Sequence, residues 1–121
     1  MSLSHIRPAQ LAAWVNEQLA LDPQTPPVVL DVREPWELGI ASVEAEIQAL
    51  GARFLHVPMR SVPDHVAEWP ETTPMACLCH HGVRSQHVAH FLVADGMTRV
   101  ANITGGIDAW SRDLNPTVPV Y

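Results

Sequence analysis

A cysteine in a loop rich in histidine, glycine and arginine is the part of this sequence best suited to covalent chemistry. Cys79 is followed by His80, His81, Gly82, Val83, Arg84 and Ser85. A thiolate is a strong nucleophile, and cations or the N–H groups at a helix start lower a cysteine's pKa. Arg84 offers a planar set of donors that suits an oxyanion, and the loop contains no acidic residue. We therefore predict a reactive thiolate at Cys79; the alternative is an inert core cysteine.

Other thiol and imidazole groups lie close to Cys79 in the sequence. Cys77 lies two residues earlier in an apolar stretch, so we expect it to pack in the core rather than to relay sulfur. His80 and His81 are expected either to tune the thiolate and contact the substrate or to be exposed without a role. A zinc site built from the cysteines and nearby histidines does not match the spacing of structural zinc sites, so we predict no metal.

The elements that must position Cys79 follow from the apolar pattern. Residues 75–79, Met-Ala-Cys-Leu-Cys, form a continuous apolar run, which is typical of a strand covered on both faces. Further short runs predict strands at residues 28–31, 54–57 and 100–103. Apolar residues at helical spacing lie between them, and we expect one helix to begin at Ser85. The alternation predicts an α/β fold with a parallel sheet, in which ligands bind beyond the carboxyl ends of strands, where Cys79 lies.

Composition limits the size of the protein and its partners. The chain has 121 residues, 47% of them hydrophobic, which predicts a single domain over residues 1–121 with its own core. Thirteen acidic and seven basic residues give a formal net charge of −6, which disfavours nucleic acid and anionic membranes as partners. All the basic residues are arginine, so chemistry that requires a lysine is excluded.

Cysteine usage and hydropathy bear on the compartment. Two cysteines one residue apart cannot form an unstrained disulfide. Residues 1–10 lack the apolar run of a signal peptide, and all apolar runs are far shorter than the ~20 residues that span a membrane. We therefore expect a cytoplasmic protein with reduced thiols.

Residues 79–85 resemble the active-site loop of single-domain rhodaneses, the thiosulfate sulfurtransferase family. Residues 29–37, Val-Leu-Asp-Val-Arg-Glu-Pro-Trp-Glu, resemble the family's strand and Asp-Val-Arg motif. Residues 102–110 resemble its Gly-Gly-x-x-x-Trp motif, and residues 54–59 fit the intervening strand. The resemblance covers nearly the whole chain in the right order. One departure is a longer stretch at residues 38–53, with a predicted helix, in place of the family's Gly-His-Ile-x-Gly-Ala segment.

The resemblance implies a rhodanese-like α/β fold, a mainly parallel five-stranded sheet with helices on both faces, and sulfur transfer. Sulfane sulfur would move from a small anionic donor such as thiosulfate, through a Cys79 persulfide, to cyanide, a thiol or a protein cysteine. It implies that Arg84 binds the donor's oxyanion end and that no metal or organic cofactor is needed. The substrate-binding loop would comprise His80, His81, Gly82, Val83 and Ser85. Ser85 would lie at the helix start and hydrogen-bond near the sulfur.

Asp31 and Arg33 follow the first predicted strand, at the same sheet edge as the loop. We expect this pair to brace the loops through a charge pair or hydrogen bonds, rather than to contact the substrate.

Two other functions remain open at this point. The first is a non-catalytic interaction module that keeps the fold as a scaffold, against which the intact loop argues. The second is an arsenate reductase or phosphatase, whose loops in related proteins are one residue longer. Cys79 through Arg84 spans six positions, which is the sulfurtransferase length.

Overall fold

One parallel sheet organises the chain. The computed structural model describes residues 3–121, and Met1 and Ser2 of the predicted domain lie outside the described residues. Five strands pair in the order β1-β5-β4-β2-β3, and every neighbouring pair is parallel. They are β1 (Leu3–Ile6), β2 (Val28–Asp31), β3 (Arg53–His56), β4 (Met75–Leu78) and β5 (Val100–Ile103). The predicted five-stranded α/β architecture is confirmed.

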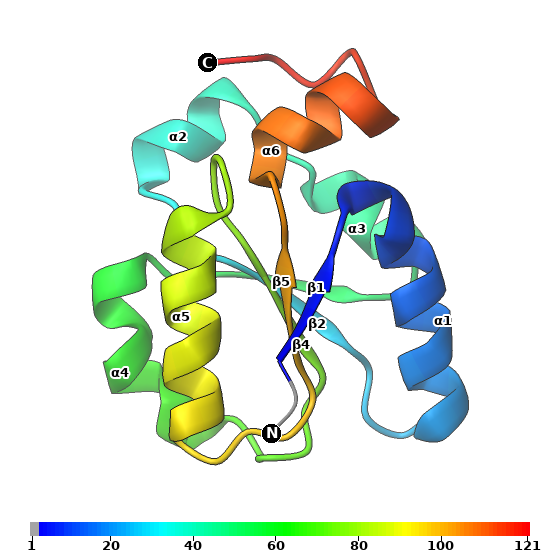
Figure 1. Cartoon of the computed structure of the whole chain (residues 1–121), viewed down its shortest axis with the longest axis vertical. Helices are drawn as coiled ribbons and strands as arrows, with labels where there is room; N and C mark the ends of the chain where they lie inside the picture. Colours follow the sequence, from blue (N-terminus) through cyan, green and yellow to red (C-terminus); the bar gives the residue numbers. More distant parts are fainter. Residues whose placement is uncertain (1–2) are drawn as a thin grey trace.

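Helices cover the two faces of the sheet, as Figure 1 shows. The helices are α1 (Leu11–Leu21), α2 (Pro35–Ile40), α3 (Glu44–Ala49), α4 (Val62–His65), α5 (Val83–Ala94) and α6 (Gly106–Ala109). Short 3₁₀ turns at Pro8–Gln10, Met59–Ser61 and Val66–Glu68 and a π-helical turn at Trp110–Leu114 complete the structure. Helices α1 to α5 lie between successive strands and provide the crossovers that parallel pairing requires, whereas α6 follows the last strand.

The core has two layers because side chains alternate across the strands. Val29 and Ile103 pack with residues of α1, α3 and α6, whereas Leu30 and Cys77 pack with residues of α4 and α5. Both layers are apolar, so β2, β4 and β5 are buried at every position. This explains why their sequences are mainly apolar rather than alternating, with Asp31 and Asn102 as buried polar exceptions.

Two local expectations are wrong. β1 was not predicted, because it is a four-residue edge strand whose central residues, Ser4 and His5, are exposed and give no apolar run. The helix after Cys79 begins at Val83 rather than Ser85. Gly82 precedes it with a φ of +97°, a left-handed conformation that glycine adopts without strain, and this allows the turn to close early. Ser85 is therefore the third residue of α5.

Candidate active site

Cys79 lies directly after β4 and is only 1% exposed. Its sulfur accepts hydrogen bonds from the backbone N–H groups of Gly82 at 3.1 Å and Ser85 at 3.3 Å. These groups converge because the loop curls into the first turn of α5, where backbone N–H groups have no partner within the helix. N–H donors placed in this way can hydrogen-bond to an anion located at the sulfur.

The side chain of Ser85 links the sulfur to the interior of the sheet. The Cys79 thiol donates to Ser85 Oγ at 3.3 Å, and that hydroxyl donates to Asn102 Oδ1 at 2.6 Å. Asn102 Nδ2 donates to the carbonyl of Gly82 at 3.3 Å. Asn102 lies in β5 and is 1% exposed. Its contribution was not predicted, although a polar residue inside an otherwise apolar strand was a usable signal.

The Gly105–Gly106 turn supports the loop from the other side. The N–H groups of Ile107 and Asp108, in α6, donate to the carbonyls of Cys79 and His80 at 2.9 and 3.0 Å. A Cβ atom on Gly106 would lie 2.3 Å from the Cys79 carbonyl oxygen, so only glycine permits this approach. The carbonyls at the start of the loop are thus satisfied by α6, while the later N–H groups face the sulfur.

Arg84 is paired with an acid that the loop sequence does not contain. Its guanidinium donates to both carboxylate oxygens of Glu37 at 2.7 and 2.8 Å. The side chain of Glu37 is 3% exposed and that of Arg84 is 35% exposed. Hydrogen bonds from Arg84 lower the pKa of Glu37 to about 2, so the carboxylate is ionised at neutral pH. The loop itself contains no acid, as the sequence shows. The fold nevertheless places the carboxylate of Glu37 against its arginine.

Asp31 and Arg33 form a buried ion pair at the same sheet edge. Arg33 donates to both carboxylate oxygens of Asp31, and neither side chain is exposed. Arg33 also donates to the Glu37 carbonyl at 3.4 Å and to the Tyr121 hydroxyl at 3.0 Å. None of these partners belongs to the Cys79 loop. The pair therefore links the end of β2 to α2 and to Tyr121.

The side chains of two loop residues, His80 and His81, form a stack of three rings with Tyr121. His80 stacks on Tyr121, with ring centroids 3.7 Å apart, and on His81, with centroids 3.8 Å apart. Burial and the neighbouring His81 lower the pKa of His80, and its Nε2 has no hydrogen-bond partner among residues 3–121. His81 and Val83 are exposed. Tyr121 was not predicted to lie near the site, because nothing in the sequence around it points to Cys79.

Cys77 lies in the core beneath α5. It is fully buried among apolar residues, and burial raises the pKa of its thiol far above the ordinary range. Both cysteines are free. This environment fits the packing role predicted for Cys77.

Within residues 3–121 no group of three His, Cys, Asp or Glu side chains could hold a metal ion. No helix in the same part of the chain is long and apolar enough to cross a membrane.

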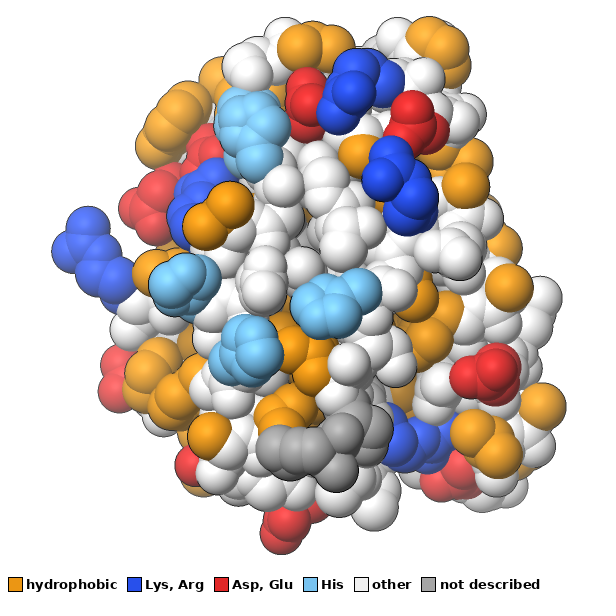
Figure 2. Space-filling model, in the orientation of Figure 1, with side chains coloured by type: hydrophobic (Ala, Val, Ile, Leu, Met, Phe, Trp, Pro, Cys, Tyr) orange, Lys and Arg blue, Asp and Glu red, His pale blue; other side chains and the backbone are white. Residues whose placement is uncertain are grey.

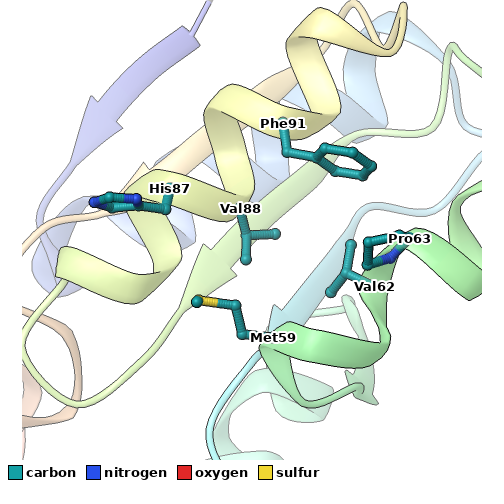
Figure 3. A pocket seen from close by; sticks show the side chains of 6 residues that line it. All are labelled: Met59, Val62, Pro63, His87, Val88 and Phe91. Carbon is teal, nitrogen blue, oxygen red and sulfur yellow. The ribbon is translucent and has the colours of Figure 1, made fainter.

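A shallow apolar groove lies next to the candidate site but is not lined by Cys79. Figure 3 shows side chains from α5 facing others from α4 and the preceding turn. The lining residues are Met59, Val62, Pro63, His87, Val88 and Phe91. The groove therefore begins one helical turn after Arg84 and runs away from the Cys79 loop along α5.

Charged side chains are unevenly distributed on the surface. On the face shown in Figure 2 they lie mainly toward the margin, and histidines lie nearer the centre. The formal net charge of −6 is therefore not spread evenly over this face.

A family model supplies the decisive comparison: the Rhodanese-like domain matches residues 8–113. The chain belongs to the rhodanese-like family. Solved structures of this family share the fold. A rhodanese-like domain protein from Staphylococcus aureus aligns with 98% of each chain at a TM-score of 0.65 and 23% identity.

Curated relatives of this rhodanese-like domain include sulfurtransferases. A sulfurtransferase of Allochromatium vinosum is 31% identical over 91 residues, covering 75% of this chain and 78% of that protein. The thiosulfate sulfurtransferase GlpE of Actinobacillus pleuropneumoniae is 42% identical over 48 residues, 40% of this chain and 44% of that protein.

Other relatives are longer proteins. The chloroplastic Rhodanese-like/PpiC domain-containing protein 12 of Arabidopsis thaliana is 36% identical over 97 residues, 77% of this chain. The aligned segment is 30% of that protein. Rhodanese-like domains thus occur both alone and beside other domains.

Proposed function

We propose that this rhodanese-like domain moves sulfane sulfur from thiosulfate, or a related anionic donor, through a persulfide on Cys79. In the first step the Cys79 thiolate attacks the outer sulfur of thiosulfate. A bond forms between Sγ and that sulfur, the S–S bond of thiosulfate breaks, and sulfite leaves with the bonding electron pair. The thiol proton has gone to solvent beforehand. The two steps together predict ping-pong kinetics.

The convergence of N–H groups on Cys79 Sγ is the observation that carries this proposal. The groups of Gly82 and Ser85 lie 3.1 and 3.3 Å from the sulfur, within reach of an anion held there. Donors fixed before the reaction stabilise developing negative charge without reorganisation. The Ser85 hydroxyl, 3.3 Å from the sulfur, donates to Asn102 Oδ1 in this structure and would turn toward the sulfur to donate to an anion there.

In the second step an acceptor removes the outer sulfur. A thiolate, on a small molecule or on a protein cysteine, attacks the outer sulfur of the persulfide. The new S–S bond forms on the acceptor, and the electron pair returns to Cys79 as thiolate. Cyanide reacts in the same way to give thiocyanate. Neither step requires a metal or an organic cofactor, and the free thiols of Cys77 and Cys79 suit a reducing compartment such as the cytoplasm.

Arg84 remains our proposed contact for the oxyanion end of the donor. A guanidinium carries five N–H donors, and Glu37 takes two of those of Arg84. The other N–H groups are available because the side chain is 35% exposed. Since Glu37 offsets the positive charge, hydrogen-bond geometry contributes more to donor binding than net charge does.

Intact mass after incubation with thiosulfate tests the mechanism. We expect the protein to gain the mass of one sulfur atom and to lose it on addition of cyanide or a thiol. Cys79→Ser should gain nothing. Cys77→Ala is the matched control, because it removes the other thiol and should still acquire the sulfur.

Two results would contradict the proposal. One is an undiminished adduct on Cys79→Ser. The other is a folded wild-type protein that acquires no sulfur from thiosulfate or from glutathione persulfide, and this result would favour a non-catalytic interaction module.

A further inference from the structure

Tyr121 joins two parts of the site that are far apart in sequence. Figure 1 shows the C-terminal segment passing over α6 toward α2, which carries Glu37. The Tyr121 hydroxyl accepts a hydrogen bond from Arg33 at 3.0 Å and donates one to Glu37 Oε1 at 3.0 Å. It therefore bridges the Asp31–Arg33 pair and the Glu37–Arg84 pair.

The hydroxyl of Tyr121 completes the environment of Glu37. That carboxylate accepts from two nitrogens of Arg84, from the backbone N–H of Glu34 at 2.9 Å, and from Tyr121. A buried carboxylate with four donors is held in one position. Because Glu37 in turn fixes the guanidinium of Arg84, the hydroxyl of Tyr121 acts on Arg84 through Glu37.

The ring of Tyr121 acts on a different residue. It is parallel to the His80 ring, with an interplanar angle of 3° and centroids 3.7 Å apart, and His81 covers the other face of His80. His80 is bonded to Cys79, and its carbonyl is held by the N–H of Asp108 at 3.0 Å. Movement of His80 would therefore displace the loop whose later N–H groups bind the sulfur.

We propose that Tyr121 is a positioning residue of the Cys79 site, which holds His80 of the Cys79 loop in place through its ring and Glu37 against Arg84 through its hydroxyl. The predicted change in kcat rests on the proposed sulfur transfer. The predicted change in the surroundings of His80 does not. The charged and titratable groups that act on the pKa of His80 are His81, Glu37 and Arg84, and Tyr121 adds a backbone hydrogen bond and its stacked ring. Of these, only Tyr121 comes from the C-terminal segment.

Separate substitutions test the ring and the hydroxyl. Tyr121→Phe keeps the stack and removes both hydrogen bonds, whereas Tyr121→Leu removes both features while keeping an apolar side chain. We expect kcat for sulfur transfer to fall about tenfold in Tyr121→Leu and a few-fold in Tyr121→Phe, since small displacements of reacting groups have effects of this order. Val120→Ala is the matched control, because Val120 is adjacent and 66% exposed.

A titration of His80 by NMR gives a readout that needs no sulfur donor. Burial of His80 holds its pKa below the ordinary value of 6.5. Tyr121→Leu should raise this pKa toward 6.5, because the ring no longer stacks against one face of the imidazole. Tyr121→Phe and Val120→Ala should leave it unchanged.

The two readouts separate the two proposals. If wild type transfers no sulfur but the pKa of His80 rises only in Tyr121→Leu, the proposed function fails and the structural link of Tyr121 to the loop stands. If folded Tyr121→Leu keeps the wild-type kcat and the wild-type His80 titration, Tyr121 has no positioning role.

Discussion

Glu37 determines the charge next to the Cys79 loop. The loop sequence contains one arginine and no acid, which predicts a positively charged anion site. The structure places a buried carboxylate on that arginine, with two hydrogen bonds of 2.7 and 2.8 Å. The hydrogen bonds to the Cys79 sulfur therefore come from oriented backbone N–H groups. The charge of Glu37 does not alter the positions of these groups.

The pH dependence of stability gives a test of the Glu37–Arg84 pair. The pKa of Glu37 falls from an ordinary 4.5 to about 2 in the folded protein, mainly through hydrogen bonds from Arg84. Because the folded pKa is the lower one, the pair contributes stability above pH 4.5 and loses it as the pH falls toward 2. We expect Glu37→Gln to lower the free energy of unfolding by roughly 1–3 kcal/mol at pH 7, a range that allows for the partial exposure of Arg84.

Denaturant unfolding at several pH values measures this effect. The difference between wild type and Glu37→Gln should shrink steadily below pH 4.5. The exposed Glu71 provides the matched control, since Glu71→Gln should have little effect at any pH. A Glu37→Gln penalty of the same size at pH 7 and pH 3 would show that ionisation of Glu37 does not stabilise the fold.

Residue types point to Cys79 as the candidate nucleophile but do not reveal the distant residues that the fold brings to it. Cys79 was identified because the strand, glycine and helix that define its environment are adjacent in sequence. Glu37, Asn102 and Tyr121 reach the site from α2, β5 and the C-terminal segment, and only the tertiary fold brings them together. A bidentate ion pair also cannot be assigned from sequence when thirteen acids could pair with seven arginines.

At the scale of elements, α6 is the second support of the loop. Its first N–H groups hold the carbonyls of Cys79 and His80, and the glycine turn before it approaches those carbonyls closely. Gly82 is packed against the same turn, because a Cβ atom there would lie 2.8 Å from the backbone nitrogen of Gly105. The Cys79 loop and the Gly105–Gly106 turn therefore form one rigid unit.

Alanine substitutions at Gly106 and Gly39 distinguish the close contact at Gly106 from the general effect of replacing a glycine. Gly106→Ala would place a methyl group 2.3 Å from the Cys79 carbonyl oxygen at a φ of +56°. We expect a loss of about 3 kcal/mol or more in the free energy of unfolding, together with loss of the sulfur adduct. Gly39 lies in α2 with nothing within 4 Å of an added Cβ. Gly39→Ala should therefore be neutral or stabilise by up to ~1 kcal/mol.

Thermal and denaturant unfolding of the two variants provide the measurement. Equal stability of Gly106→Ala and Gly39→Ala would show that the loop can move away from the turn without cost. The rigid unit of loop and turn would then be excluded.

The success of element prediction depended on burial. β2, β4 and β5 are buried at every position, so their apolar runs were sufficient. β1 contributes only its outer residues to the packed layers, and a pattern of one half-buried residue at each end gives no periodicity. The start of α5 was misplaced because serine is a common N-cap residue of helices, whereas here the left-handed Gly82 is the N-cap and the helix begins at Val83.

At the scale of the whole molecule, net charge and site chemistry are compatible. A chain with a formal charge of −6 should repel a dianion at long range. Salt screens charges beyond about 8–10 Å, whereas the N–H groups act on the sulfur at 3.1 and 3.3 Å. Composition therefore limits large anionic partners such as nucleic acid without excluding a small anion at Cys79.

The strand order predicts that local stability is higher in the central strand β4, which leads into Cys79, than in the edge strand β1. β4, which leads into Cys79, pairs with β2 on one side and β5 on the other and is buried at every position. β1 pairs only with β5, and its two central residues are exposed. Amides in central buried strands exchange with solvent only on global unfolding, whereas edge strands open locally. We expect the opening free energy of β1 amides to lie about 2 kcal/mol or more below that of β4 amides.

Native-state hydrogen exchange followed by NMR measures both values. The amide of Ala76 should exchange at the rate of global unfolding, and the hydrogen-bonded amides of β1 should exchange faster in the absence of denaturant. The amide of Ser85 should follow β4, because it donates to Cys79 Sγ and Ser85 is fully buried. If β1 is protected as strongly as β4, the sheet unfolds as one unit, and the rigidity of the sulfur site does not come from its central place in the strand order.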